Sequence, residues 1–503
     1  MKTILIFLIF ISQIFPQTQN KIPWPSLADS PWPTLRGDMQ ATGRSEFVGP
    51  ETLNVKWMGD YPLGIFHGPV IGYGDKLFFG TIALNSIEEN YIYAVNPDSS
   101  LFWRYITNSS WPNELAPLLT KDSSIIFLSN TGELYVLDFY GNLKWKKYIN
   151  NQFTDLSIDL NGNLYFTSKD TLKILDSDGS YLLQKYIKKI YGSITFSPNG
   201  QTIYFMTGKP QSLDTVYFNS ANLQGIINWN LKFDDMNYGK PSIDNIGNIF
   251  CFASDTLSKS YLYSINKEGE IRWQYRIAFD LFSATTIDPF GNVIACGIDP
   301  NSNNFVIISL TNEGSLNWQY EVGQNEEPNS GLVSDAKGNI FFGATWGTYF
   351  QALDKNGKLL WKLSLNGYEY DTSPAIGSDG TLYIGLHKST FFREHKDNLI
   401  AIGKTSVNVE DENIKVDEFF LSQNYPNPFN PSTSIKFSLP EGGITTIKVY
   451  DILGGEKATI LDEYKPAGSY TATFDGKNLP SGIYIYTITS GSFKQSRKML
   501  LMK

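Results

Sequence analysis

Between residues 50 and 403, short apolar runs alternate with glycine-containing turns, and the same order of runs returns several times. One copy contains SPAI, a turn ending in SDG, and then TLYIGL. A third run, such as YFQALD, leads through the turn KNG into a last run that ends in Trp. Short runs bounded by turn residues indicate strands rather than helices. Each copy therefore predicts four short strands, and the whole region is predicted to be all-β.

The last strand of each copy carries a repeated signature, in which Gly is followed by three residues and then Trp. Ser99 and Leu53 take the Gly position in two copies, Leu183 takes the Trp position in one, and the eight positions are 38 to 46 residues apart. A repeat of this length with four strands per copy is typical of a β-propeller blade. We predict that the Trp side chains are structural and fill the wedge between neighbouring blades. These residues are Trp57, Trp103, Trp145, Trp229, Trp273, Trp318 and Trp361.

The two ends of the repeat region are each incomplete. The last copy, residues 372–403, has three predicted strands and no Trp strand, whereas the segment around Trp57 is a Trp strand without a copy before it. If the two parts join, two exposed sheet edges disappear. We therefore predict an eight-bladed β-propeller over residues 30–403, closed by the N-terminal strand.

After the repeat the pattern changes twice. Residues 404–417 are polar and acidic without a period, which is typical of a linker. Alternating runs such as SIKFSL, TTIKVYDI, SYTATFD and GIYIYTIT then follow, separated by turns rich in Pro and Gly. This pattern predicts a small C-terminal antiparallel β-sandwich over residues 418–503.

The N-terminus predicts export. Lys2 precedes an unbroken apolar run from Ile4 to Ile11, which is the pattern of a signal peptide, and we place that peptide at residues 1–18. No later stretch is long and apolar enough to cross a bilayer, so no membrane span is expected in the mature chain.

Composition narrows the class further. The 15% aromatic content favours strands, and the net charge of −9 argues against a nucleic-acid partner, which would require a basic face. The chain has only two cysteines, so it is no disulfide scaffold. Their strand positions have opposite parity, so Cys251 and Cys296 could face each other across blades five and six. Because packed sheets lie about 10 Å apart and a disulfide needs Cα atoms within about 7 Å, we expect two buried free thiols.

The search for catalytic chemistry finds little. The three histidines, His67, His387 and His395, form no metal-binding or nucleophile motif and are interpreted as ordinary loop residues. No catalytic residue, metal site or cofactor is predicted. A bound calcium ion is the alternative. The loops after the Trp strands, predicted to surround one mouth of the channel, combine aromatic and acidic residues that could bind sugar rings or a divalent cation. The predicted ligand-binding residues are Tyr61, Trp111, Asp155, Tyr238, Asp280, Glu327, Tyr368 and Asp371.

The repeats resemble those of the PQQ-like β-propeller proteins. The resemblance lies in YAVNPDSSLFW, in ALDKNGKLLW and in WPTLRGDMQATGRSEFVGP (Trp32 to Pro50), and it covers about 370 residues. The family includes quinoprotein alcohol dehydrogenases, which use pyrroloquinoline quinone, calcium and a catalytic Asp, and also non-enzymatic scaffolds. This chain has one residue fewer in the repeat than the enzymes, and it lacks their vicinal cysteine pair.

The C-terminal segment resembles the type-A C-terminal sorting domain of type IX secretion. The motifs NYPNPFNPSTSIKFSLP, VYDILG, PAGSY, LPSGIYIYTI and KMLLMK stand in the order of that family. The resemblance implies recognition by the type IX machinery, transport across the outer membrane, and attachment to the cell surface or release. The sorting motif comprises Tyr425, Pro426, Asn427, Pro428, Phe429, Asn430 and Pro431.

Together these features predict an exported, cell-surface-displayed β-propeller that acts as a non-catalytic module and binds a glycan or protein ligand. The alternatives are a quinone- and calcium-dependent oxidoreductase and a polysaccharide-acting propeller enzyme.

Overall fold

The protein forms two compact units, Met1–Thr405 and Ser406–Lys503, which are described separately. The predicted signal peptide and linker lie almost wholly outside the described residues. The computed structural model describes residues 18–502 except 62–64, 66, 82–89, 108–115, 130, 150–155, 169, 209–214, 237–239, 256, 258, 279–284, 324–330, 344–348, 366–367, 370–372, 389–397, 405–418, 425–426, 467 and 492.

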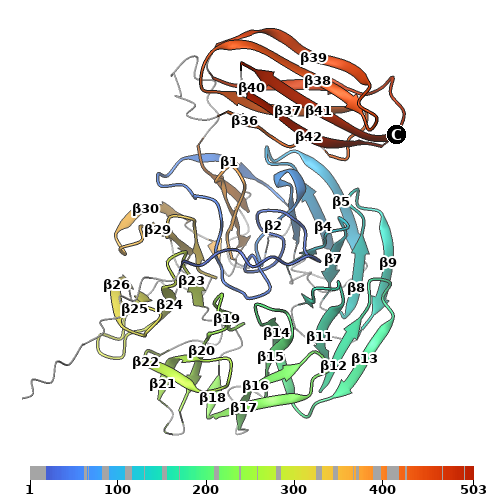
Figure 1. Ribbon diagram of the computed structural model, residues 1–503. Coiled ribbons are helices and arrows are strands. Elements are labelled where there is room, and N and C mark those ends of the chain that lie inside the picture. Colours follow the sequence, from blue (N-terminus) through green and yellow to red (C-terminus); the bar gives the residue numbers. More distant parts are fainter. Residues whose placement is uncertain are drawn as a thin grey trace, which may run out of the picture. The chain divides into compact units, whose positions relative to one another are not determined.

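The described part of the first unit is almost entirely β-structure, with one short 3-10 turn, η1 (Tyr73–Asp75). Its strands form antiparallel sheets of four or five strands that are arranged around a common centre (Figure 1). The first four sheets in chain order are β2 (Val70–Ile71), β3 (Leu77–Gly80), β4 (Asn90–Val95) and β5 (Leu101–Thr107); β6 (Leu118–Leu119), β7 (Ile125–Leu128), β8 (Glu133–Leu137) and β9 (Leu143–Tyr148); β10 (Ser157–Ile158), β11 (Leu164–Ser168), β12 (Thr171–Leu175) and β13 (Tyr181–Tyr186); and β14 (Ile190–Phe196), β15 (Thr202–Thr207), β16 (Val216–Asn222) and β17 (Ile227–Phe233).

The later sheets repeat this order, and a two-stranded ribbon joins β31 (Tyr368–Glu369) to β34 (His387–Lys388). They are β18 (Asp235–Met236), β19 (Ser242–Ile243), β20 (Ile249–Ser254), β21 (Ser260–Ile265) and β22 (Ile271–Arg276); β23 (Thr285–Ile287), β24 (Val293–Ile298), β25 (Phe305–Leu310) and β26 (Leu316–Gly323); β27 (Val333–Ser334), β28 (Ile340–Gly343), β29 (Tyr349–Leu353) and β30 (Leu359–Ser364); and β32 (Ala375–Ile376), β33 (Leu382–Gly385), β35 (Leu399–Ile402) and β1 (Val55–Gly59). Here β1, from the start of the chain, pairs antiparallel with β35 near the end of the unit.

Burial changes from the inner to the outer strand of each sheet. In the β6–β9 sheet, both residues of β6 and all four of β7 are buried, whereas β9 alternates between exposed and half-buried positions. The inner strands are covered on both faces because neighbouring sheets pack against each other, so they require apolar residues at every position. The outer strand faces solvent along one edge, and it carries Lys residues that protect an unpaired edge.

The repeated Trp side chains link each outer strand to the following turn. Each indole nitrogen donates a hydrogen bond of 2.7 to 3.0 Å to a backbone carbonyl, and in most copies that carbonyl lies in the turn before the outer strand of the next sheet. The pairs are Trp57 with Pro97, Trp103 with Phe139, Trp145 with Ser177, Trp229 with Lys267, Trp273 with Asn312, Trp318 with Lys355, and Trp361 with Pro50.

The turn glycines make room for these rings. Gly357 has a φ of +79°, and a Cβ atom there would lie 2.6 Å from the Trp318 ring. Gly162 has a similar φ of +92°, but nothing lies within 4 Å of the position of its Cβ. The two glycines therefore share the backbone requirement for positive φ and differ in whether a side chain has space.

We expect Gly357→Ala to lower the free energy of unfolding by about 2 to 4 kcal/mol, because it adds a steric clash to the cost of positive φ. Gly162→Ala, as the matched control, should cost only about 1 kcal/mol. Chemical denaturation of the two variants measures the difference. Equal losses in the two variants would mean that the Trp318 ring can move away from the new Cβ atom at no cost in free energy.

The two cysteines are buried and free, as expected, but their predicted facing arrangement is wrong. Cys251 packs in an apolar cluster with residues of the β14–β17 sheet, and Cys296 packs with residues of the β27–β30 sheet. Alternation along β20 and β24 instead turns neighbours such as Phe250 and Ala295 toward the shared junction. The two thiols therefore point away from each other, and burial raises the pKa of Cys251 to about 12.

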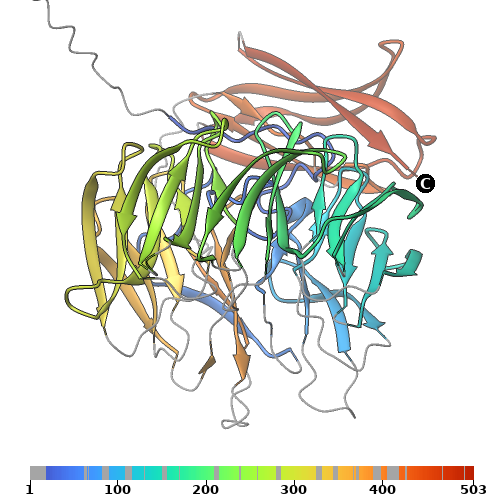
Figure 2. The same ribbon diagram turned by 90° about the horizontal axis from the view of Figure 1, so that it is seen from below.

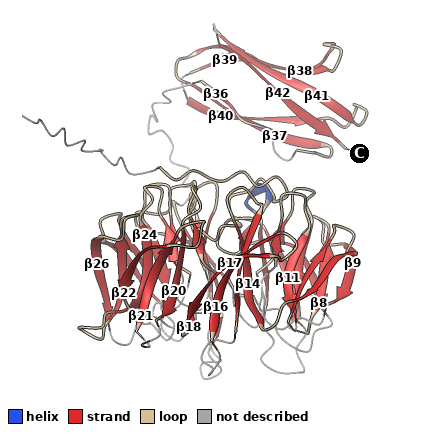
Figure 3. Ribbon diagram, turned by 60° about the horizontal axis from the view of Figure 1, so that its bottom comes forward, coloured by secondary structure: helices blue, strands red, loops and turns tan. Residues whose placement is uncertain are grey.

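The second unit is a sandwich of two antiparallel sheets around one apolar core (Figure 3). The four strands predicted there are present, and two long strands, β39 (Glu456–Lys465) and β42 (Phe493–Leu501), were missed. The smaller sheet has the order β36 (Phe420–Leu421), β37 (Ser432–Leu439) and β40 (Gly468–Asp475), and the larger has the order β39 (Glu456–Lys465), β38 (Gly443–Asp451), β41 (Gly482–Ser490) and β42 (Phe493–Leu501).

Candidate functional site

An N-terminal segment, residues 24–50, runs across the middle of the first unit (Figures 1 and 2). Its carbonyl groups accept backbone hydrogen bonds from the innermost strands, one sheet after another. This satisfies inner-edge N–H groups that would otherwise be buried without partners. The donors and acceptors are Ile71 to Trp32, Leu119 to Pro33, Phe196 to Met39, Ile243 to Gln40, Ile287 to Thr42, and Ser334 to Gly43, at 2.8 to 3.2 Å.

Arg36 is the buried cation of this segment, with 6% of its surface exposed. Its guanidinium donates to the carbonyls of Leu332 and Thr285 and to the hydroxyl of Thr286, at 2.5 to 2.8 Å. Burial lowers the pKa of Arg36 to about 10, against the opposing charge of Asp38, so the group stays charged at neutral pH. The centre of the unit is therefore held by a cation that bridges two neighbouring inner strands.

Most of the predicted ligand-binding residues lie outside the described residues: Trp111, Asp155, Tyr238, Asp280, Glu327 and Asp371. Of Tyr368 only the backbone is described, in β31. Tyr61 is described and is 8% exposed, and its ring packs edge-on against Phe79 and Tyr93. Its hydroxyl donates to the carbonyl of Ser99 at 3.0 Å, so Tyr61 belongs to the core rather than to an open aromatic platform.

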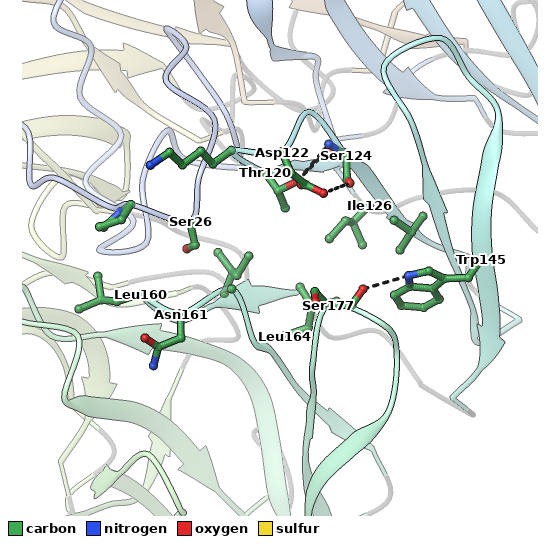
Figure 4. Close-up of a pocket in the computed structure, with 15 residues that line it drawn as sticks. Ser26, Thr120, Asp122, Ser124, Ile126, Trp145, Leu160, Asn161, Leu164 and Ser177 are labelled. Atoms are coloured by element: carbon green, nitrogen blue, oxygen red, sulfur yellow. Dashed lines mark hydrogen bonds between the residues drawn. The ribbon is translucent and has the colours of Figure 1, made fainter.

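A cavity of about 360 Å³ opens between the β6–β9 and β10–β13 sheets (Figure 4). Its walls include Ile126, Leu160 and Leu164, with Trp145 at one side. Ser26 of the N-terminal segment lies at its rim, and its hydroxyl donates to the carbonyl of Asp159 at 2.5 Å. The rest of the lining is Pro25, Thr120, Lys121, Asp122, Ser124, Val136, Ile158, Asn161, Gly162 and Ser177. The cavity thus has an apolar interior and a polar rim, which is the usual composition of a small-ligand site.

The rim carries one ionised carboxylate, that of Asp122. Partial burial opposes its ionisation, but hydrogen bonds from Lys144, Thr120 and Ser124 outweigh that effect and lower the pKa of Asp122 to about 2. Lys144 donates to it at 2.8 Å and Ser124 at 2.9 Å. At neutral pH the carboxylate is therefore already engaged, and nothing in this arrangement prepares it as a general acid or base.

We expect Asp122→Asn to lower the free energy of unfolding by less than about 1 kcal/mol at pH 6, because the side chain is 62% exposed and solvent screens the pair. The folded-state pKa lies below the usual value, so this stability is present above pH ~4 and is lost as the pH falls toward 2. Denaturant titrations of the wild type and the variant at pH 6 and at about pH 2 test this.

Lys144→Met serves as the control, since it removes the other half of the same pair and should show the same pH dependence. If the losses of the two single variants add up in the double variant, Asp122 and Lys144 do not stabilise each other.

The sequence search missed this cavity because its residues carry no motif. It contains no histidine, and its single acidic residue stands in the turn KDSS, which reads as an ordinary surface turn. No group of three or more His, Cys, Asp or Glu side chains that could hold a metal occurs in the described ranges. The described residues also contain no helix long and apolar enough to span a membrane.

The sorting motif forms part of the second unit's core. Phe429 is 2% exposed, and its ring lies 5.9 Å from that of Phe474. The backbone N–H of Phe429 donates to the carbonyl of Leu500 at 2.9 Å. The N–H of Leu500 in turn donates to the side-chain oxygen of Asn427 at 2.7 Å. The motif is therefore paired with the terminal strand β42. Tyr425 and Pro426 lie outside the described residues.

Comparison with known families identifies this second unit. The family model of the secretion system C-terminal sorting domain matches residues 423–502. The chain therefore carries a type IX sorting domain, and it is exported across the outer membrane to the cell surface or released.

Known structures resemble this chain only distantly and over part of its length. No curated protein matches it. BamB from Moraxella catarrhalis is similar over 70% of this chain and 99% of its own length, with 12% identity and a TM-score of 0.49. Virginiamycin B lyase from Staphylococcus aureus is similar over 70% of this chain and 98% of its own length, with 13% identity and a TM-score of 0.39. Likenesses of this size carry no argument about what this chain binds.

Proposed function

We propose that this protein is an exported eight-bladed β-propeller, closed by β1, that binds a ligand or partner without catalysing a reaction on it. The observation that carries the binding role is the cavity between the β6–β9 and β10–β13 sheets, with its apolar interior and its engaged carboxylate. Closure is supported by the pairing of β1 with β35 and by one apolar cluster that joins the β27–β30, β32–β1 and β2–β5 sheets.

The proposal also includes display of the protein at the cell surface. It also includes a second, glycan-binding surface formed by six of the predicted loop residues. These are Trp111, Asp155, Tyr238, Asp280, Glu327 and Asp371.

The quinoprotein alternative is disfavoured by the chemistry of the centre. In that reading the channel would hold the quinone beside a calcium ion. The described centre instead holds the buried guanidinium of Arg36, whose donors are used by Leu332, Thr285 and Thr286. A second cation beside a buried one would face repulsion that water does not screen.

The test uses the full mature chain and compares binding with turnover. Thermal unfolding is followed with calcium, with the quinone plus calcium, and with a panel of oligosaccharides. A ligand at 100 times its dissociation constant adds about 2.7 kcal/mol, or a shift of a few degrees. The same mixtures are assayed for dye-linked oxidation of alcohols and for shortened saccharides. Stabilisation without product supports the proposal, and turnover in either assay overturns it.

A further inference from the structure

The sheets of the first unit offer an internal comparison, since the same turn recurs at successive junctions. Asp288 to Asn292 and Thr120 to Ser124 have the same backbone bonds: the first residue donates to the carbonyl of the fifth, and the fourth donates to that of the first. Asp122 of the β6–β9 sheet therefore stands at the position that Phe290 takes in the β23–β26 sheet.

At the later junction, an aromatic ring closes the space between the sheets. A Cβ atom on Gly338 of the following sheet would lie 2.9 Å from the Phe290 ring and 3.2 Å from Lys355. The ammonium of Lys355 lies 5.5 Å from the centre of that ring. At the junction after the β10–β13 sheet, the Cβ position of Gly200 is 2.7 Å from Leu160 and 3.3 Å from the ring of Trp24.

At the junction with the cavity, both filling side chains are replaced. Asp122 takes the place of Phe290 and is bound to Lys144. Ser177 takes the place of Lys355, since each of the two accepts the indole hydrogen bond of the preceding Trp strand. Gly162, the counterpart of Gly338, accordingly has nothing within 4 Å of its Cβ position.

We infer that this cavity is a binding site for an aromatic ring carried by another molecule, with a neutral amide or hydroxyl group next to the ring. This inference rests on the proposed binding function and names its ligand class. The junction at Phe290 shows that a ring fits the equivalent place between two sheets. A volume of about 360 Å³ holds roughly a dozen water-sized groups, which is enough for a phenyl ring and a short polar head.

The rim supplies partners for that head. The side-chain amide of Asn161 and the hydroxyl of Ser177 lie at the opening, and neither makes a side-chain hydrogen bond to another described residue (Figure 4). The carboxylate of Asp122 accepts three hydrogen bonds, and an ionised carboxylate can accept about four. A peptide-like amide can both donate to it and accept from Asn161, whereas a sugar ring would bury hydroxyl groups against Ile126 and Leu164 without partners.

The test measures dissociation constants by ligand-observed NMR on the full chain. N-acetyl-L-phenylalaninamide should bind at least about tenfold more tightly than N-acetylglycinamide, because burial of the ring supplies the difference. Phenylacetamide distinguishes the source of the ring: weaker binding than the phenylalanine probe indicates a partner's side chain, and equal binding indicates a small aromatic amide.

Asp122→Phe tests whether the probes bind in this cavity. The new side chain should fill the cavity with a ring, as Phe290 does in the β23–β26 sheet. It should abolish binding of both aromatic probes while leaving the unfolding temperature unchanged or higher. Ile246→Phe is the matched control: it adds a ring at the same position of another turn, where the native side chain is 52% exposed, and it should leave binding intact.

Equal binding of the phenylalanine and glycine probes, or aromatic binding that survives Asp122→Phe, would overturn the inference. Glycan binding that persists in Asp122→Phe, with no aromatic binding in the wild type, would overturn it and leave the general binding function standing. Saccharide turnover or alcohol oxidation would overturn the function itself.

Discussion

Arg36→Ala is expected to lower the free energy of unfolding of the first unit by about 3 kcal/mol or more. The substitution removes the donors to the carbonyls of Leu332 and Thr285 and to the hydroxyl of Thr286, and all of these acceptors are buried. The hydroxyls of Thr286 and Ser242 still donate to the carbonyls of Leu332 and Thr285, so the loss is that of the bonds from the charged guanidinium, each worth about 1.5 to 3 kcal/mol. The loss is measured by chemical denaturation of the full chain, following the transition of the first unit.

Arg272→Ala is the control for this prediction. Arg272 is exposed, although it also donates hydrogen bonds to Ser264 and Asn312, at 2.9 and 2.8 Å. Water can take the place of the exposed guanidinium at Asn312, and the buried Ser264 loses a single bond, so the loss should be about 1 kcal/mol. Similar losses for the two variants would mean that water also reaches the centre of the unit, and that the N-terminal segment does not seal it.

Phe429→Ala is expected to abolish export by unfolding the sorting domain. The ring packs against Phe474 in the only apolar core of the described second unit. Removing a buried Phe side chain costs about 3 to 5 kcal/mol. A domain this small has few kcal/mol in reserve. Fractionation of expressing cells should show the variant retained in the periplasm while the wild type reaches the surface or the medium.

Leu453→Ala controls for general loss of apolar surface, since Leu453 is 90% exposed at a turn of the same domain. It should leave the domain folded. Normal export of Phe429→Ala, with the domain shown to be unfolded by proteolysis, would mean that export does not require the folded sandwich.

The repeat of the first unit was readable from the sequence because its determinants are local. Inner strands such as β7 are apolar at every position, and turns need glycine at positive φ, as at Gly357. Both features leave a mark at fixed spacing. The pairing of β1 with β35 could be inferred for the same reason, since an incomplete copy at each end leaves two edges to be joined.

In the second unit, the strands with alternating apolar residues were found, and the two edge strands of the larger sheet were missed. β39 and β42 carry charged residues along most of their length, and the burial pattern of β39 is largely exposed. Such strands protect a sheet edge and have no apolar alternation to reveal them. The sorting motifs nevertheless identified the domain, because they are contiguous in sequence.

Local pattern thus specified the strands, their repetition and the export domain, since each depends on neighbours a few residues apart. Contacts between distant segments specified the rest. The path of residues 24–50 across six inner strands depends on backbone N–H groups that any sequence could present. The cavity likewise exists because Asp122 and Ser177, 55 positions apart, both leave unfilled a space that Phe290 and Lys355 fill elsewhere. Neither residue predicts a cavity from its place in the sequence, because a cavity depends on what packs around it in three dimensions.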